Sequence, residues 1–404
     1  MKRIVFHIDV NSAFLSWEAA RRVRQGMPDL RLVPSAIGGD REKRTGVILA
    51  KSIPAKSFGI KTGEPVGMSL KKCPNLVLAR PDFALYERSS KAFMDICREY
   101  TPVLERFSID ECFLDMSGME LIYPDILATA YEIKDRIKRE LGFTVNVGIG
   151  SNKLLAKMAS DFEKPDKVHT LYDYEIEEKM WHLPIRELFS VGESTAQKLE
   201  RACIKTIGEL AHIDISILRS LLGVKMSEHL HNFANGIDDS PVLENRERAK
   251  GYSNSVTLED DVKTVNDAHQ ILLSLVDSTA SRMRADGVKA YCVSVTTRDI
   301  DFYDKSHQKK IGTPTDITSE IFDISSHLLD ELWDMKKPLR LLGVALTDVT
   351  EDDGVQLSIF DGAKKDKERA IDKAVDKIRH KYGNSTIVRG GAYKTDIKIG
   401  KKNK

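Results

Sequence analysis

The sequence predicts a multidomain α+β protein whose first 165 residues form a ferredoxin-like unit, an antiparallel sheet backed by helices. Three observations lead to this prediction. The chain has 404 residues, more than one ordinary domain contains. Short apolar runs alternate with amphipathic helical runs up to residue 165. Short helical runs then fill residues 175–236, and a second alternation of strands and helices follows.

Composition indicates a soluble protein of the cytoplasm. Apolar residues make up 41% of the chain and charged residues 30%, and no apolar run approaches the roughly 20 residues that span a bilayer. The acid at Asp9 comes too early for a signal peptide. Five cysteines without a Cys-x-x-Cys pair are expected to be reduced, which argues against a zinc site. We expect no membrane partner.

The net charge of +1 hides an uneven distribution of charge. From Ala363 to Lys404, fourteen Lys and Arg residues stand against five Asp and Glu residues, a net of +9, so the rest of the chain is near −8. Acidic clusters and basic grooves can therefore coexist in this protein, and the near-neutral total does not exclude a nucleic-acid partner.

The elements of the first unit follow from periodicity and from helix-capping residues. A buried strand over 2–10 ends at an Asn-Ser capping pair, and the helix after it runs to about Gln25, where Gly26 stops it. Further strands are expected at 32–37, 46–51, 76–79 and 143–149, and a hairpin at 103–107 and 112–116. Further helices are expected at 82–100, 124–141 and 152–162, and a turn-rich stretch at 53–59.

The rest of the chain is expected to form two more folded parts. A linker at 165–170 leads to the short helices of 175–236. A charged, extended stretch at 245–251 precedes a second small α+β unit. Its strands are expected at 253–258, 290–297 and 339–347, and its helices at 265–285 and 319–332. A basic tail with one helix at 367–381 follows.

Three acids stand at the ends of apolar strands. Asp9 ends the first strand, and Asp110 and Glu111 lie at the tip of the hairpin about 100 residues later. In a ferredoxin-like sheet the first strand lies beside the central hairpin, so the three carboxylates are expected to converge. They would repel one another unless a cation is present, and oxygen ligands of this type suit Mg²⁺. The alternative is that each acid merely caps a turn.

Two segments make a specific resemblance. Residues 7–14 read His-Ile-Asp-Val-Asn-Ser-Ala-Phe, residues 108–111 read Ser-Ile-Asp-Glu, and Ala-Lys-x-Phe-Gly lies between them at 55–59. These motifs resemble the Y-family DNA polymerases, and the likeness extends over about the first 350 residues. It implies a DNA-directed DNA polymerase, a nucleotidyltransferase that copies damaged templates at low fidelity, with primer–template DNA and deoxynucleoside triphosphates as partners.

The resemblance also implies an architecture. It has a palm that carries the acids, small fingers, a helical thumb with a helix–hairpin–helix turn, an α+β little finger and a C-terminal tail. The corresponding residues are 1–25 and 76–165, 26–75, 166–240, 245–350 and 351–404, in that order.

The resemblance assigns the reaction centre. It implies Asp9, Asp110 and Glu111 as catalytic metal ligands, assisted by the Val10 carbonyl, around two Mg²⁺ ions, with Mn²⁺ as an alternative. Phe14 matches the steric gate, a ring that leaves no room for a ribose 2′-hydroxyl. Without the motif, Phe14 would be interpreted as a core residue of an amphipathic helix.

Two lysines match positions that hold the incoming triphosphate in the family. Lys164, within Asp-Phe-Glu-Lys-Pro, is a good match. Lys56 departs from the pattern, because arginine is commoner there and Ile53 replaces a frequent tyrosine. A lysine offers a point charge instead of a bidentate fork, so the grip on the triphosphate differs in geometry. Alone, either lysine would be taken as a solvated surface charge.

Contacts to DNA are expected from two places. Residues 188–196 resemble a helix–hairpin–helix turn, in which Gly192 and Thr195 would lie at a phosphate, although Ser190 replaces the usual first glycine. A plain helix connector is the alternative. A second set of basic residues, Arg246, Arg248 and Lys250, precedes the strand at 253–258 and alternates with other residues. Alternation on a strand would place them on one face, where they could follow a phosphate backbone, unless that face is only solvated. Arg298, Lys305, Lys309 and Lys310 could extend this track.

A short motif follows the last expected strand. Residues 356–360 read Gln-Leu-Ser-Ile-Phe and resemble the peptide that binds the bacterial sliding clamp (the beta clamp). The anchors would be Gln356, Leu357, Ile359 and Phe360. The sequence leaves open whether accessory subunits of the SOS response are needed. Two alternatives remain: a nucleotide cyclase on a palm-like fold, and a non-catalytic DNA-binding scaffold.

Overall fold

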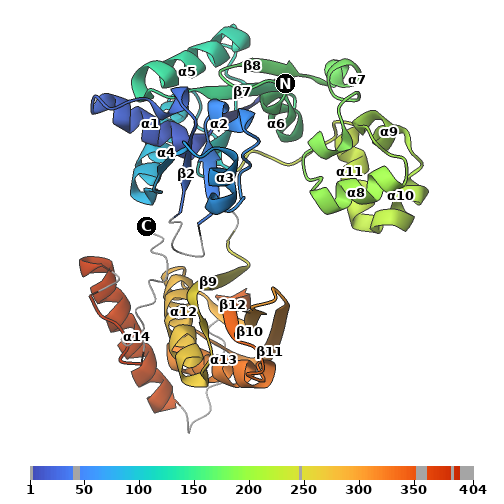
Figure 1. Ribbon diagram of the computed structural model, residues 1–404. Helices are drawn as coiled ribbons and strands as arrows, with labels where there is room; N and C mark the ends of the chain where they lie inside the picture. The colour runs from blue at the N-terminus through green and yellow to red at the C-terminus, as the bar shows by residue number, and fades with distance from the viewer. Residues whose placement is uncertain (1–2, 40–45, 245–247, 352–361, 384–385, 392–404) are drawn as a thin grey trace. The chain divides into compact units, whose positions relative to one another are not determined.

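The computed structural model describes residues 3–39, 46–244, 248–351, 362–383 and 386–391 (Figure 1). These residues form two compact units. The N-terminal unit contains the described residues 3–39 and 47–244, and the C-terminal unit contains those from 248 onward. None of the described helices is long and apolar enough to cross a membrane.

A five-stranded sheet lies at the centre of the N-terminal unit. Its order is β5-β6-β1-β7-β8, and the neighbours are antiparallel except for the parallel pair β7 and β8. The strands are β1 Val5–Val10, β5 Leu104–Arg106, β6 Glu111–Asp115, β7 Val145–Gly150 and β8 Val168–Leu171. The first strand therefore lies beside the hairpin, as a ferredoxin-like arrangement requires.

The linker predicted at 165–170 is wrong in part. Residues Val168–Leu171 form β8, which extends the sheet beside β7. The Val147 N–H donates to the Lys167 carbonyl oxygen at 2.9 Å. Only Leu171 of this strand is fully buried, so its apolar pattern is weak. The open hydrogen-bonding edge of β7 supplies the partner that the local sequence does not announce.

Helices cover both faces of this sheet. Alternate β1 residues Phe6, Ile8 and Val10 share one apolar cluster with α1, α4 and α5, because side chains alternate across a strand. On the other face, His7 contacts Ser160 of α6. The four helices are α1 Ala13–Arg24, α4 Phe83–Arg98, α5 Ile126–Leu141 and α6 Lys153–Asp161.

The serine of the Asn-Ser pair predicted to cap α1 forms no side-chain hydrogen bond at the start of that helix, whereas three other helices are capped by residues that were not predicted as caps. Asp82, Asp125 and Asn152 each accept a hydrogen bond from the backbone N–H three residues onward, at the starts of α4, α5 and α6. Helix α6 packs closely on β7, since a Cβ at Gly148 would lie 2.0 Å from the Ala156 carbonyl oxygen. The glycine thus lets α6 approach the strand beside the three acids.

The chain between α1 and α4 forms a small separate sheet with its own apolar cluster. Its order is β3-β2-β4, from β2 Ser35–Gly38, β3 Ile48–Lys51 and β4 Val77–Ala79. It carries η1 Leu30–Leu32, α2 Ile53–Ser57 and α3 Val66–Lys72. The turn-rich stretch predicted at 53–59 is instead largely helix α2, because the Ser52 side chain caps Ala55 N–H and Pro54 suits the first helical turn.

A helical cluster follows β8, as predicted for residues 175–236. Its apolar centre includes residues of α8, α9, α10 and α11 together with residues of α6. The helices are η2 Asp173–Glu175, α7 Ile176–Lys179, η3 Ile185–Glu187, α8 Glu193–Arg201, α9 Ile207–His212, α10 Ile215–Leu222 and α11 Val224–Ala234. After α11 the chain returns to the sheet, where Glu105 Oε2 accepts from Leu243 N–H at 2.9 Å.

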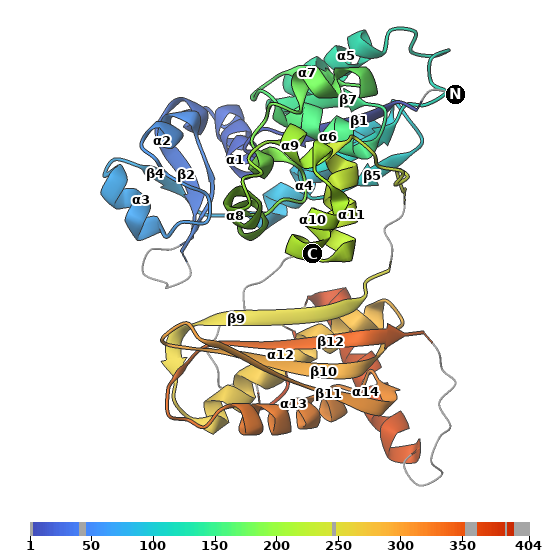
Figure 2. The ribbon, with the colours of Figure 1, turned by 90° about the vertical axis from the view of Figure 1, so that its right-hand side faces the viewer.

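The C-terminal unit contains an antiparallel sheet with two helices on one face (Figure 2). Its order is β11-β10-β12-β9, from β9 Gly251–Val262, β10 Lys289–Asp299, β11 Asp304–Thr315 and β12 Leu339–Thr350. The helices α12 Val265–Ala285 and α13 Thr318–Leu332 agree with the predicted 265–285 and 319–332. Strand β11 was not predicted. It lies at the sheet edge, and its residues 304–310 are all exposed, so it shows no apolar alternation.

The segment predicted to be a tail contains helix α14, Gly362–Tyr382, which is longer than the predicted 367–381. It lies alongside the helix layer of the C-terminal unit (Figure 1). Its side chains pair with α12, as in the 2.7 Å contact between Arg379 Nη2 and Asp277 Oδ2. The helix is therefore part of the folded unit.

Candidate active site

The two acidic segments meet at one end of the central sheet. The register of β1 and β6 places Asp9 opposite Glu111. The Val10 N–H donates to the Asp110 carbonyl oxygen at 3.0 Å, which fixes the hairpin tip against β1. Asp9, Asp110 and Glu111 are thus neighbours although about 100 residues separate them in the chain.

Two lysines from the region of α6 neutralise this acidic group. Lys164 Nζ forms ion pairs with Asp9 and, at 2.8 Å, with Asp161 Oδ1. Lys157 Nζ lies 2.8 Å from Glu111 Oε2. Burial opposes the charged form of Lys164, but the charges of Asp9 and Asp161 prevail and raise its pKa. Both lysines are therefore cations in the structure.

A buried histidine supports Glu111 from the opposite side. His7 Nε2 lies 3.0 Å from Glu111 Oε2, and His7 Nδ1 lies 2.7 Å from Ser160 Oγ. Burial lowers the pKa of His7, so the ring is neutral near pH 7. Because a carboxylate only accepts, Nε2–H donates to Glu111. The single hydroxyl hydrogen of Ser160 has two acceptors within reach, His7 Nδ1 and the Lys157 carbonyl oxygen at 2.8 Å.

The neighbouring carboxyl groups have opposite pKa shifts. Burial opposes ionisation of Glu111, but hydrogen bonds from His7 and Lys157 outweigh it and lower the pKa of Glu111 to about 2. Burial raises the pKa of Asp110, the hydroxyl of Ser108 at 2.6 Å opposes that rise, and the charges of Asp9 and Glu111 add to it. An added cation would therefore favour the ionised form of the Asp110 carboxyl group.

The carboxylates and the nearby backbone carbonyls form an all-oxygen donor set, which fits a hard divalent cation and not zinc. Within the described residues, no three Asp, Glu, His or Cys side chains are already gathered tightly enough to hold a metal ion. The reason is local, because Asp9 turns to Lys164 and Glu111 turns to Lys157. The donor set fits a cation if the carboxylates of Asp9 and Glu111 turn from their lysine partners to a metal ion.

Phe14 lies on the first turn of α1 and is half-buried. Its ring stacks on Tyr86 with centroids 4.6 Å apart and also approaches Trp17 and Phe83. The aromatic cluster fixes the ring in place. This position suits both the core-residue interpretation and the gate interpretation.

The other predicted phosphate ligands lie in separate places. Lys56 is exposed in the last turn of α2. Burial and then the charge of Lys56 lower the pKa of Lys51, so the two lysines lie near each other. Gly192 caps α8, and Thr195 is in its first turn. Ser190, at the position where the motif usually has glycine, has φ +73°, the left-handed conformation that glycine favours.

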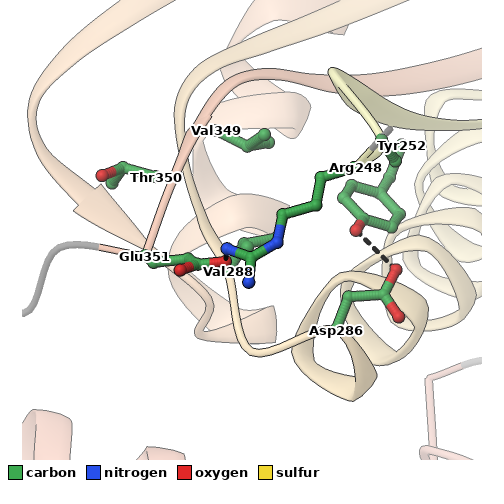
Figure 3. Close-up of a pocket in the computed structure, with 8 residues that line it drawn as sticks. Arg248, Tyr252, Asp286, Val288, Val349, Thr350 and Glu351 are labelled. Carbon is green, nitrogen blue, oxygen red and sulfur yellow. Dashed lines mark hydrogen bonds and ion pairs between the residues drawn. The ribbon is translucent and has the colours of Figure 1, made fainter. Parts of the chain in front are cut away.

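Two of the basic residues predicted before β9, Arg248 and Lys250, do not lie on a strand. Strand β9 begins at Gly251, so Arg248 and Lys250 precede it, and Arg246 lies outside the described residues. Arg248 pairs with Glu351 at a pocket of about 710 Å³ (Figure 3). Tyr252 in this pocket donates to Asp286 at 2.6 Å. The expected one-sided alternation on a strand is therefore wrong for these residues.

Arg298 lies on β10 and pairs with Asp304 of β11, with contacts of 2.6 and 2.8 Å. The strand β11 beside it carries Lys305, Lys309 and Lys310, all exposed. The clamp-like residues Gln356, Leu357, Ile359 and Phe360 lie outside the described residues.

Sequence reasoning missed Lys157 and gave no role to His7. Lys157 stands beside the apolar face of α6, next to Ala156 and Met158, and a lysine in such a place is usually solvated. A signal for His7 was present, since it is a polar residue in the inward register of a buried strand, where an ionisable group needs a partner.

Comparison with protein families gives matches along most of the chain. The model described as "impB/mucB/samB family" matches residues 8–161, and the one described as "impB/mucB/samB family C-terminal domain" matches residues 249–359. A third, described as "DNA polymerase-iota, thumb domain", matches residues 186–238. Together they cover the acidic site, the helical cluster and the C-terminal sheet.

Curated relatives match over nearly the whole chain. A protein of Clostridium acetobutylicum named DNA polymerase IV is 44% identical over 96% of this chain and 98% of its own. A Bacillus subtilis protein named DNA polymerase IV 1 is 35% identical over 98% of this chain and 94% of its own. Among solved structures, a Y-family DNA polymerase chimera matches 86% of this chain and 100% of its own, with a TM-score of 0.74 and 21% identity. That structure agrees with a fold of palm, thumb and little finger.

The Glu111 pKa predicts how stability depends on pH without added metal. A carboxyl group whose pKa falls on folding stabilises the protein above its unfolded pKa of about 4.5, and this stabilisation is lost as the pH falls toward 2. The shift corresponds to about 3 kcal/mol at neutral pH. Wild-type protein should therefore lose about 3 kcal/mol more unfolding free energy between pH 7 and pH 2 than Glu111→Gln. Urea denaturation with EDTA measures this, and equal losses would contradict it.

Proposed function

Because the chain belongs to the Y-family DNA polymerases, we propose that it extends primers across damaged templates by two-metal-ion nucleotidyl transfer, with Asp9, Asp110 and Glu111 at the reaction centre. It is a DNA-directed DNA polymerase, with DNA and nucleotides as substrates. The observation that supports this site best is the strand register that puts Asp9 opposite Glu111. Family membership argues against both a nucleotide cyclase and a non-catalytic scaffold.

Each proposed domain of the enzyme corresponds to a group of helices and strands in the structure. The palm would consist of residues 1–25 and 76–165, the fingers of 26–75, the thumb of 166–240 and the little finger of 245–350. The fingers would carry the small β3-β2-β4 sheet, which has an apolar cluster of only a few residues. Small fingers enclose a new base pair loosely, which is the physical basis that we propose for copying damaged templates.

Y-family DNA polymerases generally use divalent metal ions, and we propose two Mg²⁺ ions at this site. Asp9, Asp110, Glu111 and the Val10 carbonyl would hold them, since hard oxygen donors suit Mg²⁺. The ions would supply neutralisation of charge on the attacking 3′-oxygen, the transferred phosphate and the pyrophosphate leaving group. Mn²⁺ would bind the same donors.

The chain's own residues keep these donors in the required state. His7 and Lys157 keep Glu111 ionised and fix its orientation from two sides. Lys164, which pairs with Asp9 in the structure, would turn to the triphosphate of a bound nucleotide and release that carboxylate. Lys56 would give a second, more mobile charge from the fingers. The lysines therefore act as counter-ions before the substrate arrives.

Outside the centre, we propose that DNA is held without reading its sequence. The turn at Ser190 and Gly192 would present backbone N–H groups at the start of α8 to a phosphate, together with Thr195. Arg246, Arg248, Lys250 and Arg298 would contact the backbone from the little finger. Arg248 and Arg298 would then have to exchange Glu351 and Asp304 for phosphates.

Replacing Asp110 tests the catalytic proposal. Asp110→Asn should bind primer–template DNA like wild type but extend it at least about 1,000-fold more slowly, because charge neutralisation at the centre contributes several kcal/mol. The measurement is single-turnover extension with Mg²⁺, alongside anisotropy of labelled DNA. Asp95→Asn is the control, since among the described residues Asp95 forms ion pairs with Lys91 and Arg98 of its own helix α4, and its side chain is 46% exposed. Near-normal extension by Asp110→Asn would refute the assignment.

Replacing Phe14 tests the steric gate. Phe14→Ala should raise incorporation of ribonucleotides by about 10- to 100-fold relative to deoxynucleotides, because room for a 2′-hydroxyl appears beside the sugar. DNA synthesis should continue. Phe83→Ala is the control, since Phe83 contacts the same aromatic cluster from α4. Unchanged sugar discrimination in Phe14→Ala, or an equal change in Phe83→Ala, would show that Phe14 is only a core residue.

We also propose that Gln356, Leu357, Ile359 and Phe360 bind the sliding clamp. Tethering raises the local concentration of the enzyme at the primer end and lengthens synthesis without new DNA contacts. Deleting residues 356–360 should abolish stimulation by the clamp and leave distributive synthesis intact, as measured by primer extension on clamp-loaded DNA. Ser358→Ala, at the variable motif position, should behave like wild type. Loss of distributive synthesis on deletion would indicate a structural role instead.

A further inference from the structure

Helix α14 separates its charges between two faces. Lys367, Lys373, Lys377 and Lys381 are all exposed, and at 100° per residue they fall within an arc of about 120°. We call these four lysines the basic face of α14. Asp366 is the one acid that shares this side, with its side chain 71% exposed. The other acids of the described helix face the domain.

Those inward acids are bound to the first turn of α13 and the last turns of α12. Asp372 Oδ2 accepts from the Thr318 N–H at 2.8 Å and lies 3.3 Å from Arg284 Nη1. Asp376 Oδ2 lies 2.7 Å from Arg284 Nε. Asp372 and the Arg284 side chain are almost completely buried. None of these acids is therefore available to neutralise the basic face.

The inward arginines complete this interface. Arg379 pairs with Asp277 at 2.7 Å, and Arg369 pairs with Asp316 at 3.0 Å. After the helix, Arg389 returns to the same place, 3.0 Å from Asp277 and in contact with Asp372. Buried ion pairs of this kind are directional and costly to break. They fix the rotation of α14 about its axis, so the basic face points outward.

A simple solvated helix face does not explain this arrangement. Such faces usually alternate the sign of charge at i and i+4, where opposite charges attract. Here Lys373, Lys377 and Lys381 follow one another at that spacing and repel. Among the described residues, none of the three forms an ion pair, and the ammonium of Lys381 lies 5.1 Å from the centre of the Tyr382 ring. An anionic partner would relieve the repulsion.

We propose that the basic face of α14 is a second DNA-binding surface, which holds the phosphate backbone of the polymerase's own DNA substrate. The proposal rests on the polymerase assignment, because the substrate of a polymerase is DNA, a polyanion. Helices α12 and α13 lie between α14 and the sheet, so this surface is separate from the basic residues of β10 and β11 (Figures 1 and 2). The DNA bound by α14 is therefore a different stretch from that on the sheet.

The polymerase assignment, and not the composition of the helix, favours DNA over a membrane surface. An interfacial helix inserts an apolar face into lipid beside its lysines. Only Ala370 and Ala374 lie between the lysines of the basic face, but Ile371 and Tyr382 beside it are 49% and 63% exposed. The lysines themselves make the sequence-independent contacts typical of phosphate binding.

The test measures how DNA binding depends on salt. Each phosphate contact contributes about 0.9 to the slope of log K against log salt for duplex DNA. The full-length triple variant K373Q/K377Q/K381Q should therefore lower the slope by about 2 to 3 relative to wild type, by anisotropy of a labelled primer–template with a long duplex. Glutamine is a good helix former, so α14 should persist. Extension at saturating DNA should be unchanged.

Two further variants keep the result unambiguous. K373R/K377R/K381R retains the charges and should keep the wild-type slope. Asp366→Lys adds a fifth cation to the same face and should raise the slope by about 1. It removes a 3.8 Å contact with Arg369, which keeps its 3.0 Å pair with Asp316. A slope within about 0.5 of wild type in both the glutamine variant and Asp366→Lys would overturn the proposal. Failure of wild-type protein to extend a primer would instead refute the polymerase function, whatever the slopes.

Discussion

Electrostatic repulsion among three carboxyl groups is the constraint on which the N-terminal unit depends. The pairing of β1 with β6 brings Asp9 against Glu111, and the Val10 contact adds Asp110. The fold offsets this repulsion with cations from one neighbouring segment, α6 and the residues after it. That segment can approach because Gly148 leaves room for the Ala156 carbonyl. The strand register brings the acids together, and the close packing of α6 supplies the cations that offset their charge.

The two lysines that offset the charge of the acids, Lys157 and Lys164, differ in exposure. Lys157 is largely enclosed, and together with His7 it holds Glu111 in its ionised form. Lys164 is more exposed, at 35% of its side chain, and reaches Asp9 from the end of α6. An enclosed counter-ion suits a permanent role, and an exposed one can exchange partners when a triphosphate and metal ions arrive. Metal ions would thus replace Lys164 as the counter-charge of Asp9 once the nucleotide is bound.

The C-terminal unit uses ion pairs for a different purpose. Helix α14 is held against α12 by arginine–aspartate pairs, around Asp277 and Asp372, and not by the apolar cluster of the unit. Polar contacts specify orientation more strictly than apolar ones, since each needs its partner at a set distance and angle. This explains how a helix so rich in lysine can be a fixed element. Glu351 and Gly362, the described residues on either side of the clamp-like segment, belong to the same folded unit.

The sequence by itself determined the elements whose signals are local. The helix at 265–285 and the hairpin that carries the acids follow from periodicity and from the polar residues between two apolar runs. Only the tertiary structure decided the elements that need a distant partner. Strands β8 and β11 have weak apolar patterns and form because a neighbouring strand offers an open edge. Lys157 and the inward acids of α14 look like solvated charges until the helix that carries them is packed. A charge acquires its role from the groups that surround it in space, and one stretch of sequence does not contain them.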